Sequence, residues 1–454
     1  NMKNGSSEDN HLGRKVIAVE RYFYKRPNPN VIMIGRFQGV ISEEQLKAAI
    51  SKVRKRHPLL NARIRQEKNG DAYFITESVG EPWVQVIDFD SIGVDDLLGR
   101  AVKELRTRHS TEHGPLIRFV LFRTQNGFDL LVNSHHMICD GLSLYYLIRD
   151  IFVHLSTPDR KIVPLPEPVI VENNLPPSAT LKNYYNKLIL RFNKSWAKKG
   201  IIFDEADDIR LHDKFWKMEE GLNITHWNLS ERQTSSLIQR CRKENISVHS
   251  ALCTAFLLAQ IEVQGKEPYL RNISMPVSIR NRLAAPVGEA FGLYFSSFKI
   301  KFKRPKEKSF WANALAVHEH IQQQITDKNV FTVYMQLKDL HPTLVDSISF
   351  TRYGELEDKL AKRLLRLEGD YTLNTGLDLS NLGVLEMPDN RGLLILKDII
   401  GPCCYNEFQE KYLGVVTLGK MYFTVTYREP VVSKSVVESL KKVAMKHLGE
   451  AVGW

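Results

Sequence analysis

The most informative stretch of this sequence is Leu130-Leu-Val-Asn-Ser-His-His-Met-Ile-Cys-Asp-Gly141. Its apolar first part predicts a buried strand, and two histidines, an aspartate and a glycine follow. Residues 142–152 then carry apolar side chains at helical spacing, which predicts a helix. The polar cluster therefore lies where a strand ends and a helix begins. Such a junction is a favoured place for a reactive group, because a rigid element aims its side chain.

The spacing His-His-x-x-x-Asp-Gly is specific, since average residue frequencies give a chance match in roughly one such sequence in a thousand. In this chain the spacing is formed by His135, His136, Asp140 and Gly141. It resembles the active-site motif of the chloramphenicol-acetyltransferase-like superfamily. That superfamily includes peptide-synthetase condensation domains, polyketide-associated acyltransferases, alcohol acetyltransferases and plant BAHD acyltransferases.

Other stretches resemble further segments of the superfamily and follow in the same order. They are Arg54–Leu60, Gly114–Arg118, Met275–Arg280 followed by Phe291–Ser297, and Ser380–Gly383. The resemblance extends from Val16 to Leu448. The Asp-Phe-Gly-Trp-Gly signature of BAHD enzymes is missing, and Phe291–Ser297 lacks the Asn-Thr of peptide-synthetase domains. The sequence also contains no adenylation or carrier domain. We therefore expect a free-standing acyltransferase, similar to the alcohol-acetyltransferase-like and polyketide-associated members.

The composition is that of a soluble globular protein, with 43% hydrophobic and 25% charged residues in 454. No run of 18 or more apolar residues occurs, so we expect no membrane span. The five cysteines have no regular spacing and predict no disulfide framework. The polar N-terminus lacks the apolar core of a signal peptide. These features favour a cytoplasmic location.

The formal net charge is +11, which we attribute first to solubility. The alternative explanation of this positive charge is attraction to an anionic partner, such as coenzyme A or an acidic carrier protein. The densest basic run, Lys299–Lys308, is typical of a strand end and a solvated loop. We expect no nucleic-acid partner.

Helix and strand patterns mix in both halves of the chain. Six prolines between Thr157 and Pro177 exclude a helix or a central strand there and indicate a linker. The sequence predicts four parts: a disordered leader over residues 1–15, a first lobe over 16–156, a linker and crossing segment over 157–213, and a second lobe over 214–454.

Local signals also place single elements. Capping boxes at Ser42-x-x-Gln45 and Ser230-x-x-Gln233 predict two helix starts. Residues 248–263 predict an apolar helix that is buried on most sides, and residues 372–379 predict a strand.

The resemblance implies an α/β fold of the α+β type. It consists of two chloramphenicol-acetyltransferase-like lobes, each a mixed sheet flanked by helices, with the active site in a tunnel between them. In such enzymes a segment of the second half often crosses back to the first. We expect Ser380–Ile400 to be that segment.

The paired histidines argue against a shared metal. Neighbouring side chains on a strand point to opposite faces, so His135 and His136 cannot both converge on one ion. One should face the cleft and the other the core. The resemblance selects His136 as the catalytic base and leaves His135 as a packed, hydrogen-bonded support. We expect no metal and no bound cofactor.

The resemblance also implies roles for the other motif residues. Asp140 could orient His136, but the resemblance favours a structural ion pair with Arg280. Gly141 would allow a close backbone approach or an unusual dihedral, and its amide is a candidate donor to the developing oxyanion. Asn381 is a second candidate oxyanion donor, with a turn or cap residue as the alternative, and Ser380 is a candidate substrate-binding neighbour.

The function implied is acyl transfer from a thioester, on coenzyme A or a carrier protein's phosphopantetheine, to the hydroxyl of a small-molecule alcohol. The alternatives are amide formation with an amine acceptor and an inactive homologue that binds carrier proteins. A serine hydrolase is excluded because no Gly-x-Ser-x-Gly occurs.

Overall fold

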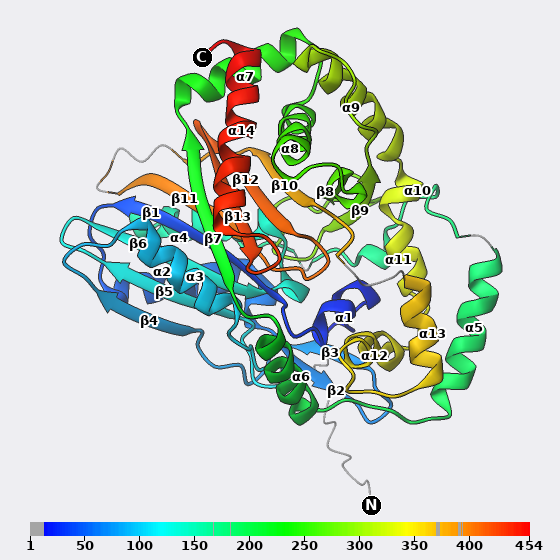
Figure 1. The fold of residues 1–454 in the computed structure, drawn as a ribbon. Helices are drawn as coiled ribbons and strands as arrows, with labels where there is room; N and C mark the ends of the chain where they lie inside the picture. Colours follow the sequence, from blue (N-terminus) through cyan, green and yellow to red (C-terminus); the bar gives the residue numbers. More distant parts are fainter. Residues whose placement is uncertain (1–12, 167, 182, 369–372, 389–391, 393) are drawn as a thin grey trace, which may run out of the picture.

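The motif strand β6 (Gly127–His135) lies inside the sheet of the first lobe, with a strand on either side (Figure 1). The expected leader over residues 1–15 falls largely outside the described residues. The computed structural model describes residues 13–166, 168–181, 183–368, 373–388, 392 and 394–454.

Both faces of the first sheet are covered by helices. Leu130 and Val132 of β6 pack with α2 (Glu43–Arg56) and α4 (Gly141–Ser156), whereas Leu131 packs on the opposite face with α3 (Val94–Leu105). This burial on two sides explains why residues 130–132 are apolar in succession instead of alternating with polar residues. In spatial order the strands are β11 (Ile395–Cys403), β1 (Asn30–Gln38), β6, β5 (Ile117–Arg123) and β4 (Trp83–Asp88).

The second lobe has its own mixed sheet, in which β10 runs parallel to both of its neighbours and the other pairs are antiparallel. Helix α8 is buried along most of its length, as its apolar composition predicts. The strands in spatial order are β7 (Leu222–Leu229), β13 (Lys420–Arg428), β12 (Lys411–Leu418), β10 (Leu377–Val384), β8 (Asn272–Ser278) and β9 (Phe295–Lys301). The helices packed with them are α7 (Glu231–Lys243), α8 (Val248–Gln264), α9 (Phe310–Gln324) and α14 (Lys434–Val452).

The crossing strand is β11, which pairs antiparallel with β1 of the first lobe. The strands before and after it along the chain, β10 and β12, belong to the second sheet. We expected the crossing over Ser380–Ile400, and its position is only partly correct. Residues 377–384 stay in the second lobe as β10, and the strand that reaches the first lobe continues to Cys403.

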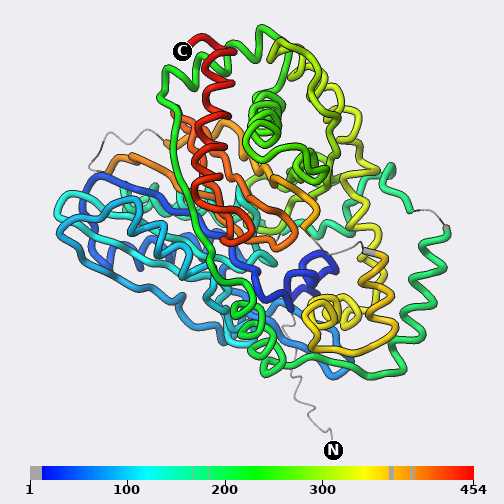
Figure 2. The backbone as a smooth tube through the Cα atoms, in the orientation of Figure 1, coloured from blue at the N-terminus to red at the C-terminus, as the bar shows by residue number. Residues whose placement is uncertain are grey.

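In the predicted linker and crossing segment, packed helices follow the proline-rich residues 157–177, in the part that the sequence predicts to be partly helical. Three side chains of α5 (Asn183–Ala197) share a buried cluster with residues of α12 (Pro342–Arg352) and α13 (Lys359–Glu368). They are Ile189, Phe192 and Trp196. Figure 2 shows α5, in green, beside the gold segment that contains α13. The next helix, α6 (Glu205–Met218), packs Phe215 and Trp216 against the first sheet. The chain therefore gains apolar contacts along its passage between the lobes.

The shorter elements complete the two lobes. A hairpin of two short strands, β2 and β3, follows α2, and α1 contacts both α11 and α12. Their bounds are α1 (Ala18–Tyr24), β2 (Arg63–Gln66), β3 (Ala72–Ile75), α10 (Asp327–Val330), α11 (Thr332–Leu337), α12 (Pro342–Arg352) and α13 (Lys359–Glu368).

Among the described residues, no single helix has the length and hydropathy needed to cross a membrane. Helices α7 and α8, which meet at 104°, reach those limits only as a bent pair.

Candidate active site

A cavity of about 350 Å³, here called the central cavity, lies between the two lobes. Strand β6 ends at His135, and a short 3-10 turn begins at His136, so the motif leaves the sheet where the lobes meet. The first lobe contributes His136, Asp140 and Gly141 to the cavity wall. The second lobe contributes residues of β8, β9 and β10. The strand-to-helix junction therefore presents the motif to both halves of the molecule.

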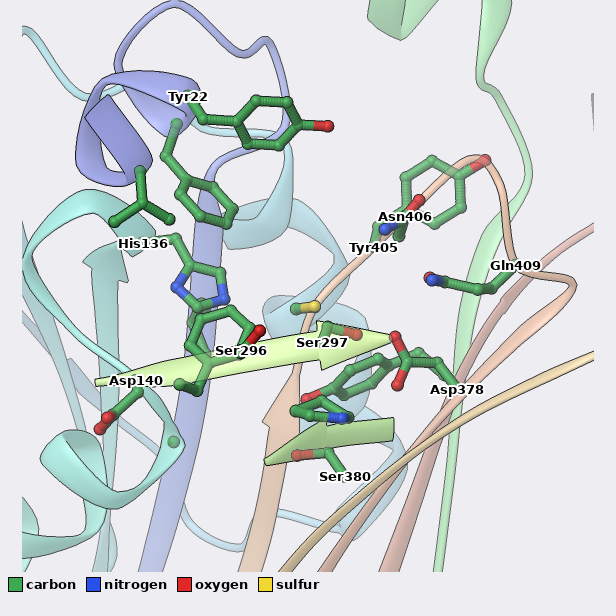
Figure 3. A pocket seen from close by; sticks show the side chains of 18 of the residues that line it. Tyr22, His136, Asp140, Ser296, Ser297, Asp378, Ser380, Tyr405, Asn406 and Gln409 are labelled. Atoms are coloured by element: carbon green, nitrogen blue, oxygen red, sulfur yellow. The ribbon is translucent and has the colours of Figure 1, made fainter. Parts of the chain in front are cut away.

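His136 lies in the cavity wall with a defined orientation (Figure 3). Its Nδ1 lies 2.8 Å from the carbonyl oxygen of Cys139, and its ring is stacked between Phe23 and Phe295 at centroid distances of 4.5 and 5.0 Å. A carbonyl accepts only, so Nδ1 carries the hydrogen and the neutral ring keeps a lone pair on Nε2. Burial lowers the pKa of His136 below its ordinary 6.5. The imidazole is therefore an unprotonated base at neutral pH.

His135 lies in the core instead. Its side chain is buried, and its Nδ1 accepts a hydrogen bond of 3.2 Å from the Met137 amide. Burial, together with the neighbouring rings of His109 and His136, holds its pKa well below 6.5. The ring therefore stays neutral and supports the turn. The structure places the two histidines on different sides of the chain, as the alternation of a strand requires.

Asp140 points away from His136 and begins helix α4 (Figure 3). Its Oδ1 accepts from the Ser143 amide at 2.8 Å, and its Oδ2 accepts from the Tyr294 amide at 3.1 Å. The Nη2 atom of Arg280 donates to both carboxylate oxygens, at 2.9 and 3.1 Å. These partners leave the carboxylate no role in orienting His136. They fix the loop that carries it.

Arg280 connects this loop to the second lobe. Its Nη1 donates to the carbonyl oxygens of Gly288 and Ala290 at 3.0 and 2.8 Å, and its Nη2 also reaches the Ser143 hydroxyl at 2.9 Å. The side chains of Arg280 and Asp140 are only 4% and 6% exposed. A buried pair with this many hydrogen bonds fixes geometry across the interface between the lobes.

Gly141 permits a close approach between the lobes. A Cβ at this position would lie 2.9 Å from a methyl carbon of Leu382 and 3.5 Å from Pro402. Its φ is not in the left-handed region, so the glycine leaves space for the Leu382 side chain and does not serve an unusual dihedral. As the first residue of α4, it also places the positive end of the helix at the cavity.

Ser380 and Asn381 line the cavity from β10. The side-chain oxygen Oδ1 of Asn381 accepts a hydrogen bond from the backbone amide of Gly383 at 2.9 Å, and Gly383 has a φ of +80°. Asn381 therefore stabilises a turn, the alternative considered from the sequence. Its amide nitrogen is the group left to donate to a ligand.

Family profiles match both halves of the chain. The profile "Condensation domain" matches residues 23–162, and "Phthiocerol/phthiodiolone dimycocerosyl transferase C-terminus" matches residues 219–360. The chain belongs to the condensation-domain superfamily. Its chloramphenicol-acetyltransferase-like fold of two lobes, with mixed sheets and flanking helices, is thereby confirmed.

Two relatives with different names match over long stretches of the chain. Gramicidin S synthase 1 of Brevibacillus brevis is 19% identical over 461 residues, which are 95% of this chain and 39% of that protein. Phthiocerol/phthiodiolone dimycocerosyl transferase of Mycobacterium tuberculosis (strain H37Rv) is 24% identical over 257 residues, 56% of this chain and 59% of that protein. The matches thus span well under two thirds of either relative.

Solved structures share the fold over nearly the whole chain. The epimerization domain of tyrocidine synthetase B, third module, aligns with a TM-score of 0.65 and 16% identity, covering 98% of both chains. Polyketide synthase associated protein 5 from Mycobacterium tuberculosis aligns with a TM-score of 0.62 and 16% identity, covering 97% of this chain and 99% of that one. The chain therefore shares its fold with both of these proteins.

Asp378 and Gln409 are among the polar cavity residues of this condensation-domain protein that were not predicted from the sequence. A signal existed for one of them, because Asp378 lies in a strand between two leucines, Leu377 and Leu379. A charged side chain in such a strand is unusual unless it is paired or functional.

One group of potential metal ligands exists elsewhere in this condensation-domain chain. Ligand atoms of Glu112, His113 and Glu205 lie within 4.8 Å of one another at the surface. None of the three lines the central cavity.

Proposed function

We propose that this chain is an acyltransferase that moves an acyl group from a thioester to the hydroxyl of an acceptor, with His136 as general base. The observation that carries the proposal is the state of His136. Its Nδ1 is committed to the Cys139 carbonyl, and its neutral ring lies in a cavity between the lobes. A base of this kind suits an acceptor whose own proton must be removed during attack.

The reaction moves one proton, forms one C–O bond and breaks one C–S bond. The acceptor oxygen attacks the thioester carbonyl carbon while Nε2 of His136 takes the hydroxyl proton. The tetrahedral intermediate then collapses, the C–S bond breaks, and the imidazolium returns the proton to the leaving thiolate. The products are an ester and a free thiol. General-base catalysis supplies roughly 10²–10⁴-fold, and holding the two substrates together supplies much of the rest.

The developing oxyanion needs donors at the same wall. The first turn of α4, which begins at Gly141, supplies amides and the positive end of a helix dipole at the cavity. The Asn381 amide nitrogen is the second candidate, from the opposite lobe. The donor substrate is an acyl thioester of coenzyme A or of a carrier protein, and the net charge of +11 favours such an anionic partner.

The choice of a hydroxyl over an amine is supported by the match of residues 219–360 to the dimycocerosyl transferase profile and by the Ser380-Asn-Leu-Gly383 segment. Amide formation is the second candidate, favoured by the match of residues 23–162 to the condensation-domain profile. A chain that only binds carrier proteins is the third candidate, which the neutral, cavity-facing His136 disfavours.

A substrate panel tests the proposal. The purified chain is incubated with acyl-coenzyme A of several chain lengths and with matched alcohols and amines. We expect thiol release that depends on an alcohol and an ester product identified by mass. Amide products alone would replace the ester assignment with the second candidate. An absence of thiol release with both coenzyme A and carrier-bound donors would contradict acyl transfer itself.

The pH dependence of the rate tests the state of His136. Because burial lowers the pKa of this base below 6.5, it becomes protonated and inactive only in more acidic solution. With a neutral alcohol as acceptor, we expect kcat/KM to be flat above pH 6.5 and to fall below an apparent pKa that lies under 6.5. Ester formation measured by mass across this range gives the profile. An acid limb centred above 6.5 would contradict the assignment.

A further inference from the structure

The wall of the central cavity across from His136 carries a buried carboxyl group. Asp378 lies on β10, its residue is 5% exposed, and it lines the cavity. Its Oδ1 atom has no hydrogen-bond partner within the described part of the chain. Burying an unpaired carboxyl costs free energy that structural residues normally avoid. An unsatisfied carboxyl aimed into a cavity therefore indicates a ligand that satisfies it.

A second unsatisfied acceptor lies on the same side. The Oε1 atom of Gln409 is buried and also lacks a partner among the described residues. Figure 3 shows Asp378 and Gln409 together on one side of the cavity, with His136 on the other. Two oxygen acceptors without donors call for a ligand group that donates more than one hydrogen bond. An ammonium group, with three N–H donors and no acceptor, is such a group.

Within the described residues, no lysine or arginine that lines the cavity pairs with Asp378. Arg26 is the one lysine or arginine among the described cavity residues, and its guanidinium donates to both carboxylate oxygens of Glu407 at 3.2 Å. The titratable groups that interact with Asp378 are the Cys404 thiol and the Tyr412 hydroxyl, which are neutral at pH 7. Burial therefore raises the pKa of Asp378 to about 8.

We propose that Asp378, with Gln409 beside it, binds a protonated amine on the acceptor, remote from the hydroxyl that reacts at His136. This proposal names the acceptor class of the proposed function, an amino alcohol, and rests on that function. The ammonium held at Asp378 is not the attacking group, because it lies across the cavity from the base (Figure 3). A ligand cation also supplies the partner that lets the carboxyl ionise while it is buried.

The ionisation of Asp378 can be detected in a binding experiment without any reaction, as the release of a proton. At pH 7 the free carboxyl is mostly protonated, and an ammonium ion lowers its pKa by pairing with the carboxylate. Binding should therefore release about one proton per site. An alkanol of the same length should release none, because it brings no charge.

The test titrates the full chain, without acyl donor, with linear amino alcohols of increasing length and with alkan-1-ols and diols of matched length. Calorimetry in two buffers of different ionisation enthalpy measures the released protons. We expect the best amino alcohol to bind at least about tenfold more tightly than its alkanol, as for a charge-assisted contact, and to release a proton. Asp378→Asn should abolish both the preference and the proton release and leave alkanol binding unchanged. Asp88→Asn is the matched control, because it removes one carboxylate at the surface, where the side chain is 69% exposed.

The outcomes separate the claims. Equal binding of amino alcohols and alkanols, or no binding of any amino alcohol, overturns the Asp378 assignment. Diols that bind as tightly as amino alcohols, without proton release, also overturn it. If the Asp378→Asn variant does not fold, proton release by the unaltered chain on binding an amino alcohol still tests the Asp378 assignment. Amino-alcohol binding with proton release but no acyl transfer from any thioester leaves the ammonium site in place and refutes the proposed function.

Discussion

Replacing His136 with alanine is expected to lower the rate of acyl transfer to an alcohol by roughly 10²–10⁴-fold, the contribution typical of a general base. The acceptor hydroxyl has a pKa far above neutrality, so it cannot attack without losing its proton to His136. The fold should persist, because the ring projects from a turn whose backbone is held separately. The amide of His136 donates to the Pro29 carbonyl at 2.6 Å. Thiol release and a thermal melt of the same preparation measure both effects.

His135→Ala is the matched control for this variant. It removes a buried ring and the acceptor of the Met137 amide, so it should reduce the melting temperature more than His136→Ala does. It should reduce the chemical step less. A His136 variant with unaltered turnover would refute the general-base mechanism. A large loss with alcohols but a small one with amines would still fit, because a neutral amine is nucleophilic without a base.

Asp140→Asn should destabilise the protein by about 3–5 kcal/mol, the usual cost of breaking one side of a buried ion pair. Asparagine can still cap α4 through its carbonyl oxygen, so the change mainly removes charge. It leaves the Arg280 guanidinium buried without a counterion. We also expect slower turnover, because the pair holds the loop that presents His136. Denaturant midpoints and slopes measure the free energy of unfolding.

The coupling is measured by adding Arg280→Ala alone and in combination. A coupling energy of roughly 0.5–3 kcal/mol would match residues in direct contact. The control pair is Arg282 and Asp327, also 2.9 Å apart, whose side chains are 30% and 35% exposed. Solvent screens that pair, so its loss should cost less than about 1 kcal/mol. Additive effects of Asp140→Asn and Arg280→Ala would show that the buried contact does not contribute.

Local signals predicted much of the fold. The capping boxes at Ser42 and Ser230 form as expected, with the backbone amides of Gln45 and Gln233 donating to the serine hydroxyls at 3.1 and 3.2 Å. They were predictable because a cap depends on residues within one helical turn. The motif was readable for the same reason, since its strand, turn and helix are contiguous.

Elements that depend on tertiary contacts were not predictable. Helix α12 has the sequence Pro342-Thr-Leu-Val-Asp-Ser-Ile-Ser-Phe-Thr-Arg352, rich in β-branched residues and serine, which disfavour helix. It forms because it is buried nearly throughout and because Asp346 pairs with Arg21 of α1 at 2.6 Å. The position of Asp378 between two leucines is unusual, but the sequence does not show its role, for a related reason. Only the folded chain shows that this carboxyl faces a cavity and lacks a partner.

The strand β11 has a consequence for the order in which the protein is made. It completes the first sheet by pairing with β1, but it is encoded after most of the second lobe. During synthesis, which proceeds from the N-terminus, β1 has an open edge until Cys403 has left the ribosome. Unpaired N–H and C=O groups along such an edge are a template for pairing with other chains. The nascent first lobe therefore passes through a long period in which it is prone to aggregation, and that period ends only when the second lobe is nearly complete.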